Sequence, residues 1–302
     1  MFTQLLAVCL GMTLLLYGGE RAVDAAVALA RALGLSTLLI GGTLVAVGSS
    51  IPEIATAIYG GLYGAGDFVV GHIVGSATSQ ITLGVGVVAL LSPLELERRK
   101  VLVYGLGMIA AMAAMALVIE SGTVTRVEGG ALVTAYVLFV LVRIHADEDI
   151  ATIEEADYRP AHAVAWILAG FVLVAVGGHL LVANGRALAV ELGVPAFLLG
   201  LVTGLGTTIP EIVIAALAVH RDEGDIAVGT LFGSNVTDPL FSLGLGALAG
   251  GLVIKHVGGA LLATGYMLAV ATIVVALFVA TGGISRRAAI GCIALYVPTY
   301  LL

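Results

Sequence analysis

The segment GTLVAVGSSIPEIATA at residues 42–57 recurs as GLVTGLGTTIPEIVIA at residues 200–215, at a constant offset of 158 residues. The same offset continues without a gap over residues 42–86, where 14 of 45 positions carry the same residue in both copies. Such an extended match exceeds what a shared apolar composition produces and indicates a duplicated structural unit. The sequence therefore predicts two related halves.

The sequence around these segments has the composition of a membrane protein. Of its 302 residues, 60% are hydrophobic and 11% are charged, whereas soluble domains carry about 25% charged residues. Gly is abundant, at 41 residues, as expected where transmembrane helices pack closely. We expect an all-α integral membrane protein that contacts a lipid bilayer and has no nucleic-acid partner.

Ten apolar runs approach or exceed the roughly 20 residues that a helix needs to cross a bilayer. We place these spans at residues 2–18, 36–60, 67–92, 100–119, 127–144, 161–181, 195–219, 225–250, 256–280 and 286–302. A shorter apolar stretch at residues 23–33 either lies near the interface or extends a neighbouring helix.

The number of spans sets the relative orientation of the two halves. We expect a first five-helix repeat at residues 1–144, an acidic cytoplasmic linker at residues 145–160 and a second five-helix repeat at residues 161–302. Because five is odd, the second repeat must enter the membrane from the opposite side, as in many secondary transporters. An external N-terminus places ten of the 13 Lys and Arg residues on the cytoplasmic side. The predicted topology is therefore two inverted repeats with both termini outside.

Three acidic residues fall inside the predicted spans, namely Glu53, Glu211 and Asp238. An ionisable residue at membrane depth is costly and indicates a functional site. No Lys or Arg lies in the interior of these spans, so a bound cation or a proton must compensate the acids. Both glutamates follow a proline, which lacks an N–H and leaves a carbonyl four residues earlier without its helical partner. The pattern predicts broken helices that expose backbone oxygens near the acids.

Further oxygen-bearing residues accompany these acids at helical spacing. Two hydroxyl residues precede each proline, and a second pair of spans places a serine four residues before Gln80 and before Asp238. The hydroxyl residues are Ser49, Ser50, Thr207, Thr208, Ser76 and Ser234. A set of donors that is all oxygen argues against Zn²⁺, Cu⁺ and iron, and a flexible cage favours Ca²⁺ and Na⁺ over Mg²⁺.

We interpret three polar residues near these positions as structural residues. Asp67 and Asp225 each follow a glycine at a predicted helix start, and we expect them to be N-caps. His72 lies one turn before Ser76, where a hydrogen-bonded packing role is favoured and pH sensing is the alternative.

The motifs GTLVAVGSSIPE (42–53), GHIVGSATSQ (71–80), GLVTGLGTTIPE (200–211) and GTLFGSNVTD (229–238) resemble the two α-repeats of the cation/Ca²⁺ exchanger superfamily, in particular prokaryotic sodium/calcium exchangers. The resemblance implies a Ca²⁺ site formed by the carboxylates of Glu53 and Glu211 and the carbonyls of Ser49 and Thr207. It implies Na⁺ sites at Ser50, Thr208, Ser76, Ser234 and the carbonyls of Ala46 and Gly204. It also implies a midplane site at Gln80 and Asp238.

The same resemblance implies an antiporter in a prokaryotic cell membrane that needs no cofactor, carries Ca²⁺ and Na⁺, and works as a monomer. Two departures lie in the first repeat, where Gln80 replaces the family's shorter Asn or Asp and Ala77 aligns with Asn235. A Ca²⁺/H⁺ antiporter and a K⁺-dependent exchanger would use the same glutamates and stay open as alternatives. A channel is disfavoured because the chain carries its own two-fold repeat, and an enzyme because no Ser–His pairing or metal-protease spacing is present.

Overall fold

The chain is almost entirely helical in the residues that its computed structural model describes, which are 2–32, 43, 46–95, 98–145, 160–220 and 224–301. The first half contains α1 (Phe2–Ala32), α3 (Ala46–Ser49), α4 (Ile51–Leu62), α5 (Gly66–Ser79), the π-helix η2 (Gln80–Gly84), α6 (Val85–Leu91), β1 (Leu94–Glu95), α7 (Arg98–Ile119), β2 (Thr123–Val124) and α8 (Arg126–His145). The second half contains α9 (Pro160–Leu192), α10 (Ala196–Thr207), α11 (Ile209–His220), α12 (Gly224–Thr237), the π-helix η3 (Asp238–Ser242), α13 (Leu243–Gly250), β3 (Leu252–Val253), α14 (Val257–Thr281), β4 (Gly283–Ile284), α15 (Arg286–Ala294) and the 3-10 helix η4 (Val297–Tyr300).

The sequence duplication is visible in the element boundaries. Helices α4 and α11 start 158 residues apart and have 12 residues each. Helices α5 and α12 keep the same offset with 14 residues each, and the π-helical turns η2 and η3 follow them with five residues each. Single π-helical turns inside α-helices occur frequently at functional sites. Both turns begin at a residue that the sequence singles out, Gln80 and Asp238.

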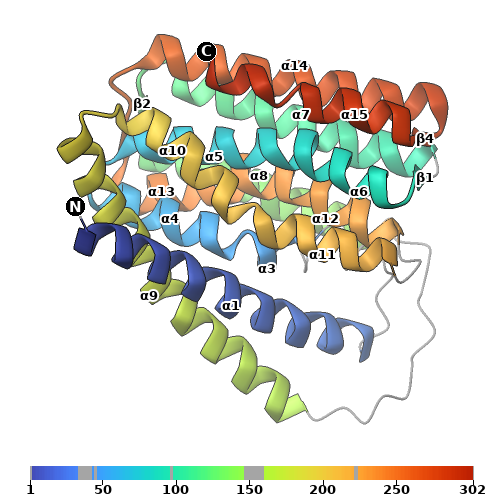
Figure 1. Ribbon diagram of the computed structural model, residues 1–302, viewed down its shortest axis with the longest axis horizontal. Coiled ribbons are helices and arrows are strands. Elements are labelled where there is room, and N and C mark those ends of the chain that lie inside the picture. The colour runs from blue at the N-terminus through green and yellow to red at the C-terminus, as the bar shows by residue number, and fades with distance from the viewer. Residues whose placement is uncertain are drawn as a thin grey trace.

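Two long helices lie together along one side of the molecule. Helices α1 and α9 pack against each other below the rest of the bundle in Figure 1, whereas α7 and α14 pack together on the opposite side. The remaining site-bearing elements, α3–α5 and α10–α12, lie between these two pairs. Helix α1 has 31 residues and α9 has 33, which at about 1.5 Å per residue exceeds the roughly 30 Å hydrocarbon thickness. The apolar stretch at residues 23–33 therefore extends the first helix, as far as Ala32.

Among the described residues, four helical stretches are long and apolar enough to cross a membrane. They are Gly66–Leu91, Arg98–Ile119, Arg126–His145 and Val257–Thr281, which agree with the third, fourth, fifth and ninth predicted spans. The first of them is 83% buried and the third is 17% buried, so the former is a central helix and the latter presents its apolar residues outward. Phe2–Leu14 and Ala196–Thr207 are shorter apolar helices.

Some predicted spans differ from the helices observed. The span at 286–302 was expected to be one helix, but α15 ends at Ala294 and the chain continues as the 3-10 helix Val297–Tyr300, which contains Pro298. A proline removes a backbone donor, so helices usually stop before it. The spans at 36–60 and 195–219 are each interrupted, at Ser50 and at Thr208. Residues 33–42 and most of the linker at 145–160 lie outside the described residues.

Helices α5 and α10 touch through their backbones. A methyl group added at Gly71 would lie 2.3 Å from the Phe197 carbonyl oxygen, and one added at Gly204 would lie 2.3 Å from the His72 carbonyl oxygen. Gly75 and Gly200 face the partner backbone equally closely, at 2.4 Å. Small residues at four-residue spacing permit this close approach between membrane helices. The crossing brings Ser76 on α5 next to the end of α10.

Two short strand pairs join the halves at the two ends of the molecule. Strand β1 pairs with β4, with Leu94 opposite Ile284, and β2 pairs with β3, with Thr123 opposite Val253. The β1–β4 pair lies at one end of α7 and the β2–β3 pair lies near the other end (Figure 1). Each end of the bundle therefore contains a connection from the first half and one from the second.

The prediction that Asp67 and Asp225 are N-caps of their own helices is wrong. Both residues lie in the first turn, inside α5 and α12. The Asp67 carboxylate instead accepts hydrogen bonds of 3.0 Å from the backbone N–H groups of Lys255 and His256, just before α14 begins. Asp225 pairs with the ammonium group of Lys100 at 3.3 Å. Their shared function is to fix the start of a helix from the other half.

Replacing Gly71 by Ala should destabilise the protein, because the new methyl group meets a backbone carbonyl that cannot move independently of α10. Overpacking of this kind costs about 1–3 kcal/mol. Gly265→Ala is the matched control, since nothing lies within 4 Å of a methyl group added there. Thermal unfolding of both purified variants in detergent measures the difference. Equal midpoints for the two variants would contradict the backbone contact.

Asp67→Ala should cost about 1–2 kcal/mol of stability, because two backbone N–H groups at the start of α14 lose their acceptor. Asp225→Ala, at the equivalent position of the other half, removes a partly exposed ion pair and should cost about 0–1 kcal/mol. Chemical or thermal unfolding compares the two. A larger loss for Asp225→Ala would contradict this assignment.

Candidate cation site

Two broken helices face each other in the middle of the bundle. The chain interrupts its α-helical geometry at Ser50 between α3 and α4, and at Thr208 between α10 and α11. Pro52 and Pro210 follow each break by two residues and supply no N–H, so Gly48 and Gly206 lose their usual helical donors. Each predicted break is thus an interruption of one residue, at which the hydrogen bonds from Ser50 N to Ala46 O and from Thr208 N to Gly204 O are kept.

The Ser76 hydroxyl connects side chains from α4, from the break after α10 and from the two π-helical turns. Its oxygen lies 3.1 Å from Glu53 Oε1, 3.1 Å from Thr208 Oγ1 and 3.4 Å from Asp238 Oδ2. The Gln80 amide nitrogen donates to the same oxygen at 3.1 Å. A serine hydroxyl has one hydrogen to donate, so it cannot satisfy Glu53 and Asp238 together. The cluster thus has more acceptors than this hydroxyl can serve.

The predicted site residues form one buried cluster. Glu53, Glu211 and Asp238 are each 0% exposed and interact electrostatically with one another. The hydroxyls of Ser49 and Ser234 lie 3.4 Å apart and bridge the two halves. The other members, also buried, are Ser50, Ser76, Gln80, Thr207 and Thr208.

The two glutamates retain unpartnered oxygen atoms. Within the described part of the chain, Glu53 Oε2 and both carboxylate oxygens of Glu211 are buried without a hydrogen-bond partner. Segments 46–95, 196–220 and 224–250, which carry the cluster, contain no Lys or Arg. Burying an ionised carboxylate without a partner costs several kcal/mol. The orphaned oxygens therefore call for a cation or a proton.

Neutral oxygens surround the glutamates across the interface between the halves. The Ser49 hydroxyl lies beside the Glu211 carboxylate, and the Thr207 hydroxyl lies beside the Glu53 carboxylate. Each hydroxyl thus faces the acid of the other copy. Among the described residues, no three His, Cys, Asp or Glu side chains lie close enough together to hold a metal ion without further ligands. A cation at this place would need these hydroxyl and carbonyl oxygens as additional ligands.

The carbonyls of Ala46 and Gly204 border the cluster and are engaged within their own helices. Ala46 O accepts from Ser50 N at 3.0 Å and from Ser49 Oγ at 3.3 Å. Gly204 O accepts from Thr208 N at 3.1 Å, from Thr208 Oγ1 at 2.8 Å and from Thr207 Oγ1 at 3.1 Å. A carbonyl oxygen has two lone pairs, so these contacts occupy the positions that an ion would use. Binding of a cation at either carbonyl requires the neighbouring hydroxyl groups to turn away, namely Ser49 at Ala46 and both Thr207 and Thr208 at Gly204.

His72 belongs to a hydrogen-bonded packing network, as the sequence favoured. Its Nδ1 atom lies 3.1 Å from Thr203 Oγ1 and its Nε2 atom lies 3.4 Å from Thr207 Oγ1. The Thr203 hydroxyl donates to carbonyl oxygens of its own helix, and the Thr207 hydroxyl likewise donates to the Gly204 carbonyl oxygen at 3.1 Å. The imidazole therefore contacts two hydroxyl groups of α10 and packs beside Thr207.

Asn235 and Ser242 adjoin the site and were not among the predicted ligands. Asn235 Nδ2 donates to Gln80 Oε1 at 2.8 Å, and Ser242 Oγ donates to Asp238 Oδ1 at 3.4 Å. Ser242 is four residues after Asp238, a spacing that could have indicated the contact. In the first repeat, Ala77 stands at the position equivalent to Asn235. This difference between the repeats is the sequence signal that could have indicated the Asn235 contact.

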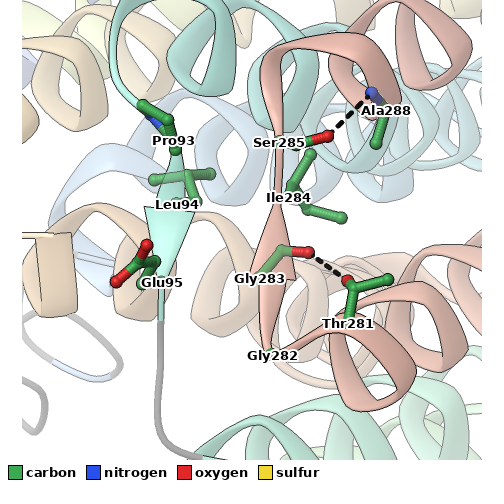
Figure 2. Close-up of a pocket in the computed structure, with 9 residues that line it drawn as sticks. All are labelled: Pro93, Leu94, Glu95, Thr281, Gly282, Gly283, Ile284, Ser285 and Ala288. Atoms are coloured by element: carbon green, nitrogen blue, oxygen red, sulfur yellow. Dashed lines mark hydrogen bonds between the residues drawn. The ribbon is translucent and has the colours of Figure 1, made fainter.

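A surface pocket between β1 and β4 is a different feature. It has a volume of about 290 Å³ and includes Pro93, Leu94, Glu95, Thr281 and Ser285 in its lining. Figure 2 shows the Glu95 carboxylate on the side of β1 away from β4, while Ser285 accepts from the backbone of Ala288. With one exposed carboxylate, this pocket offers much less charge to a cation than the buried cluster does.

The comparison with known families agrees with this picture of two related halves. The model of a family described as sodium/calcium exchanger protein matches residues 3–145 and 162–301. The putative antiporter CaxA of Alkalimonas amylolytica is 30% identical over 259 residues, covering 82% of this chain and 81% of that protein. The sodium/calcium exchanger MaX1 of Methanosarcina acetivorans is 26% identical over 327 residues, covering 93% of each chain.

Solved structures show the same architecture. The sodium-calcium exchanger NCX_Mj soaked with 10 mM Na⁺ and 10 mM Sr²⁺ aligns with a TM-score of 0.71 and 25% identity, covering 99% of this chain and 98% of that chain. NCX_Mj soaked with zero Na⁺ and Ca²⁺ aligns with a TM-score of 0.70 and 25% identity. The resemblance that the sequence motifs suggested is thereby confirmed.

Adding Ca²⁺ to the purified protein should raise its thermal midpoint, because the ion satisfies carboxylates that folding leaves unpartnered. A ligand at 100 times its dissociation constant stabilises by about 2.7 kcal/mol. Glu211→Gln should lose this increment, whereas Glu120→Gln, at an exposed helix end, should keep it. Equal Ca²⁺ increments in both variants would argue against the cluster as the binding site.

Proposed function

Because this chain belongs to the sodium/calcium exchanger family, we propose that it is a secondary antiporter that exchanges Ca²⁺ for Na⁺ by alternating access. Family membership makes it a multi-pass membrane transporter of the cation/Ca²⁺ antiporter class and not an enzyme. With Na⁺ entering down its gradient, the exchange would extrude Ca²⁺ from the cytoplasm of a prokaryotic cell. The ions are cargo, and the exchange needs no cofactor.

The observation that carries this proposal is the pair of buried glutamates with unpartnered oxygens. Glu53 and Glu211 come from equivalent positions of the two repeats and share one buried cluster. Two carboxylates can neutralise one Ca²⁺, and the same oxygens can be shared among Na⁺ ions of similar radius. Because both ions need the same glutamates, they exclude each other from the site. Mutual exclusion couples the two fluxes, since an empty site with uncompensated charge crosses the membrane poorly.

The choice of Na⁺ over H⁺ rests on the neutral oxygens. Ser49, Ser50, Thr207 and Thr208 are buried hydroxyl residues within four positions of the glutamates in the sequence, and a site that binds only protons would not need them. A hydroxyl oxygen is a suitable ligand for hard cations such as Na⁺ and Ca²⁺. A Ca²⁺/H⁺ antiporter and a K⁺-dependent exchanger are the alternatives that the flux experiment below separates.

We propose that the chain forms ten transmembrane helices in two inverted repeats, with both termini outside. The strand pairing supports the inversion, because β1 precedes α7 and pairs with β4, which follows α14. Strand β2 follows α7 and pairs with β3, which precedes α14. Each helix therefore starts where its counterpart ends, so α7 and α14 run in opposite directions. The repeats would comprise residues 1–144 and 161–302 and share a site that one monomer completes.

Alternating access would be a sliding of α1 and α9 across the broken helices. Both are long, and they pack together on one side of the bundle (Figure 1). Helix α1 reaches the break between α10 and α11, where a methyl group added at Gly206 would lie 2.5 Å from Met12 Cε. A flexible methionine at this contact tolerates changes in packing. The pair could therefore move over the site while the rest of the bundle stays in place.

Flux measurements in proteoliposomes test the function. A Na⁺ gradient should drive ⁴⁵Ca²⁺ uptake into vesicles, whereas a K⁺ gradient or a pH gradient alone should not. Glu53→Gln should abolish the flux by removing one of the two charges that balance Ca²⁺, and Glu120→Gln should transport like the unmodified protein. Flux driven by a pH gradient alone would favour the Ca²⁺/H⁺ antiporter. Near-normal ⁴⁵Ca²⁺ flux in Glu53→Gln would contradict the proposed site.

A further inference from the structure

Asn235 fixes the orientation of the Gln80 amide through a chain of hydrogen bonds. Asn235 Nδ2 lies 2.7 Å from the Leu231 carbonyl oxygen, one turn back on α12. A carbonyl oxygen accepts and never donates, so the Asn235 atom at this position must be the amide nitrogen. The same nitrogen lies 2.8 Å from Gln80 Oε1 and donates its second hydrogen there. The Gln80 atom that faces Asn235 must therefore be the amide oxygen.

The Gln80 amide nitrogen is consequently directed into the cluster. It donates to Asp238 Oδ2 at 3.2 Å and to Ser76 Oγ at 3.1 Å, which uses both of its hydrogens. Gln80 and Asn235 are 0% exposed, so water does not compete for these bonds. The side chain that the sequence predicted as an oxygen ligand thus presents a donor.

The three buried acids differ in the hydrogen bonds that their carboxylate oxygens accept. Asp238 accepts at Oδ2 from Gln80 and at Oδ1 from Ser242, whereas within the described residues Glu211 accepts at neither oxygen. A cation next to Asp238 Oδ2 would meet the partial positive charge of the Gln80 N–H₂ group. The amide thus occupies the place beside Asp238 that a cation would otherwise take.

We propose that Asn235 is a positioning residue that holds Gln80 as a hydrogen-bond donor to Asp238 and so confines bound cations to the part of the cluster around Glu53 and Glu211. This inference rests on the proposed function and specifies that its site holds no cation beside Asp238. Asn235 acts through Gln80 and touches no ion itself. Ala77, the counterpart of Asn235 in the first repeat, has no amide, so the first repeat lacks this positioning contact.

The first test counts the Na⁺ ions that displace Ca²⁺. ⁴⁵Ca²⁺ binding to the purified full-length protein is measured at rising Na⁺ concentration, and the slope of log apparent Kd against log Na⁺ concentration gives that number by linkage. Gln80→Leu and Asn235→Leu should each raise the slope by about one, because Asp238 then recruits a cation. Thr230→Val is the control, since it alters a buried hydroxyl of the same helix that has no partner among the described residues.

Two results of this slope measurement would overturn the proposal. If Gln80 were an ion ligand, Gln80→Leu would lower the slope, and that outcome would overturn the proposal. An unchanged slope in Asn235→Leu would also overturn it, because a residue that only packs changes stability and not the ion count.

A second test does not depend on transport or on ions. Thermal midpoints of Asn235→Leu, Gln80→Leu and the double variant, measured without Na⁺ and Ca²⁺, report whether the two amides act as a unit. The double variant should unfold close to the less stable single variant. Additive losses would overturn the Asn235–Gln80 contact. If the losses are non-additive but the unmodified protein does not bind Ca²⁺, the proposed function fails while the positioning contact stands.

Discussion

Three carboxyl groups share the interior of a bundle whose neighbouring segments contain no Lys or Arg. Glu53, Glu211 and Asp238 are buried, and their charge cannot be cancelled by a basic residue on the segments that carry them. A fold with this content is stable only if hydrogen-bond donors, protons or visiting cations compensate the acids. The two glutamates keep oxygens that the described residues do not satisfy, whereas Asp238 is satisfied by donors. The need for a mobile compensating ion follows from this shortage.

The surrounding structure holds this cluster together. Glycines let α5 and α10 meet backbone to backbone, which places Ser76 within 3.1 Å of Thr208. The breaks at Ser50 and Thr208 bring hydroxyls, carbonyls and carboxylates to the same depth. Strand pairs at both ends tie the halves, and Asp67 and Asp225 fix helix starts across them. Helices α1 and α9 lie to one side and contact the site-bearing helices from there.

The sequence predicted which residues of the candidate site lie together better than it predicted the helix boundaries, because the repeat and the prolines are local signals. Glu53 and Glu211 are found by aligning the two repeats, and Pro52 and Pro210 indicate where the helices are interrupted. Other features depend on distant partners. Asp67 looked like a cap of its own helix, yet its partners Lys255 and His256 are 188 and 189 residues away. The first span seemed to end before Arg21, but that guanidinium lies 5.3 Å from the Tyr17 ring and 5.8 Å from the Trp166 ring, so α1 continues past it. Likewise, no pattern of residue types could reveal which end of the Gln80 amide faces Asp238.

The differences between the two copies are as informative as their likeness. A strictly symmetric site would have the same residue at positions 80 and 238 and at positions 77 and 235. Acids at both 80 and 238 would add a fourth carboxylate to a cluster that already lacks compensation, and amides at both would remove one charge from it. The chain instead has Gln80 opposite Asp238, with Asn235 added on the side of the acid. One copy thus supplies the charge and the other supplies the donor that satisfies it. The duplicated glutamates remain the only pair of equivalent acids among these aligned cluster positions, and they are the pair to which our proposal assigns ion binding.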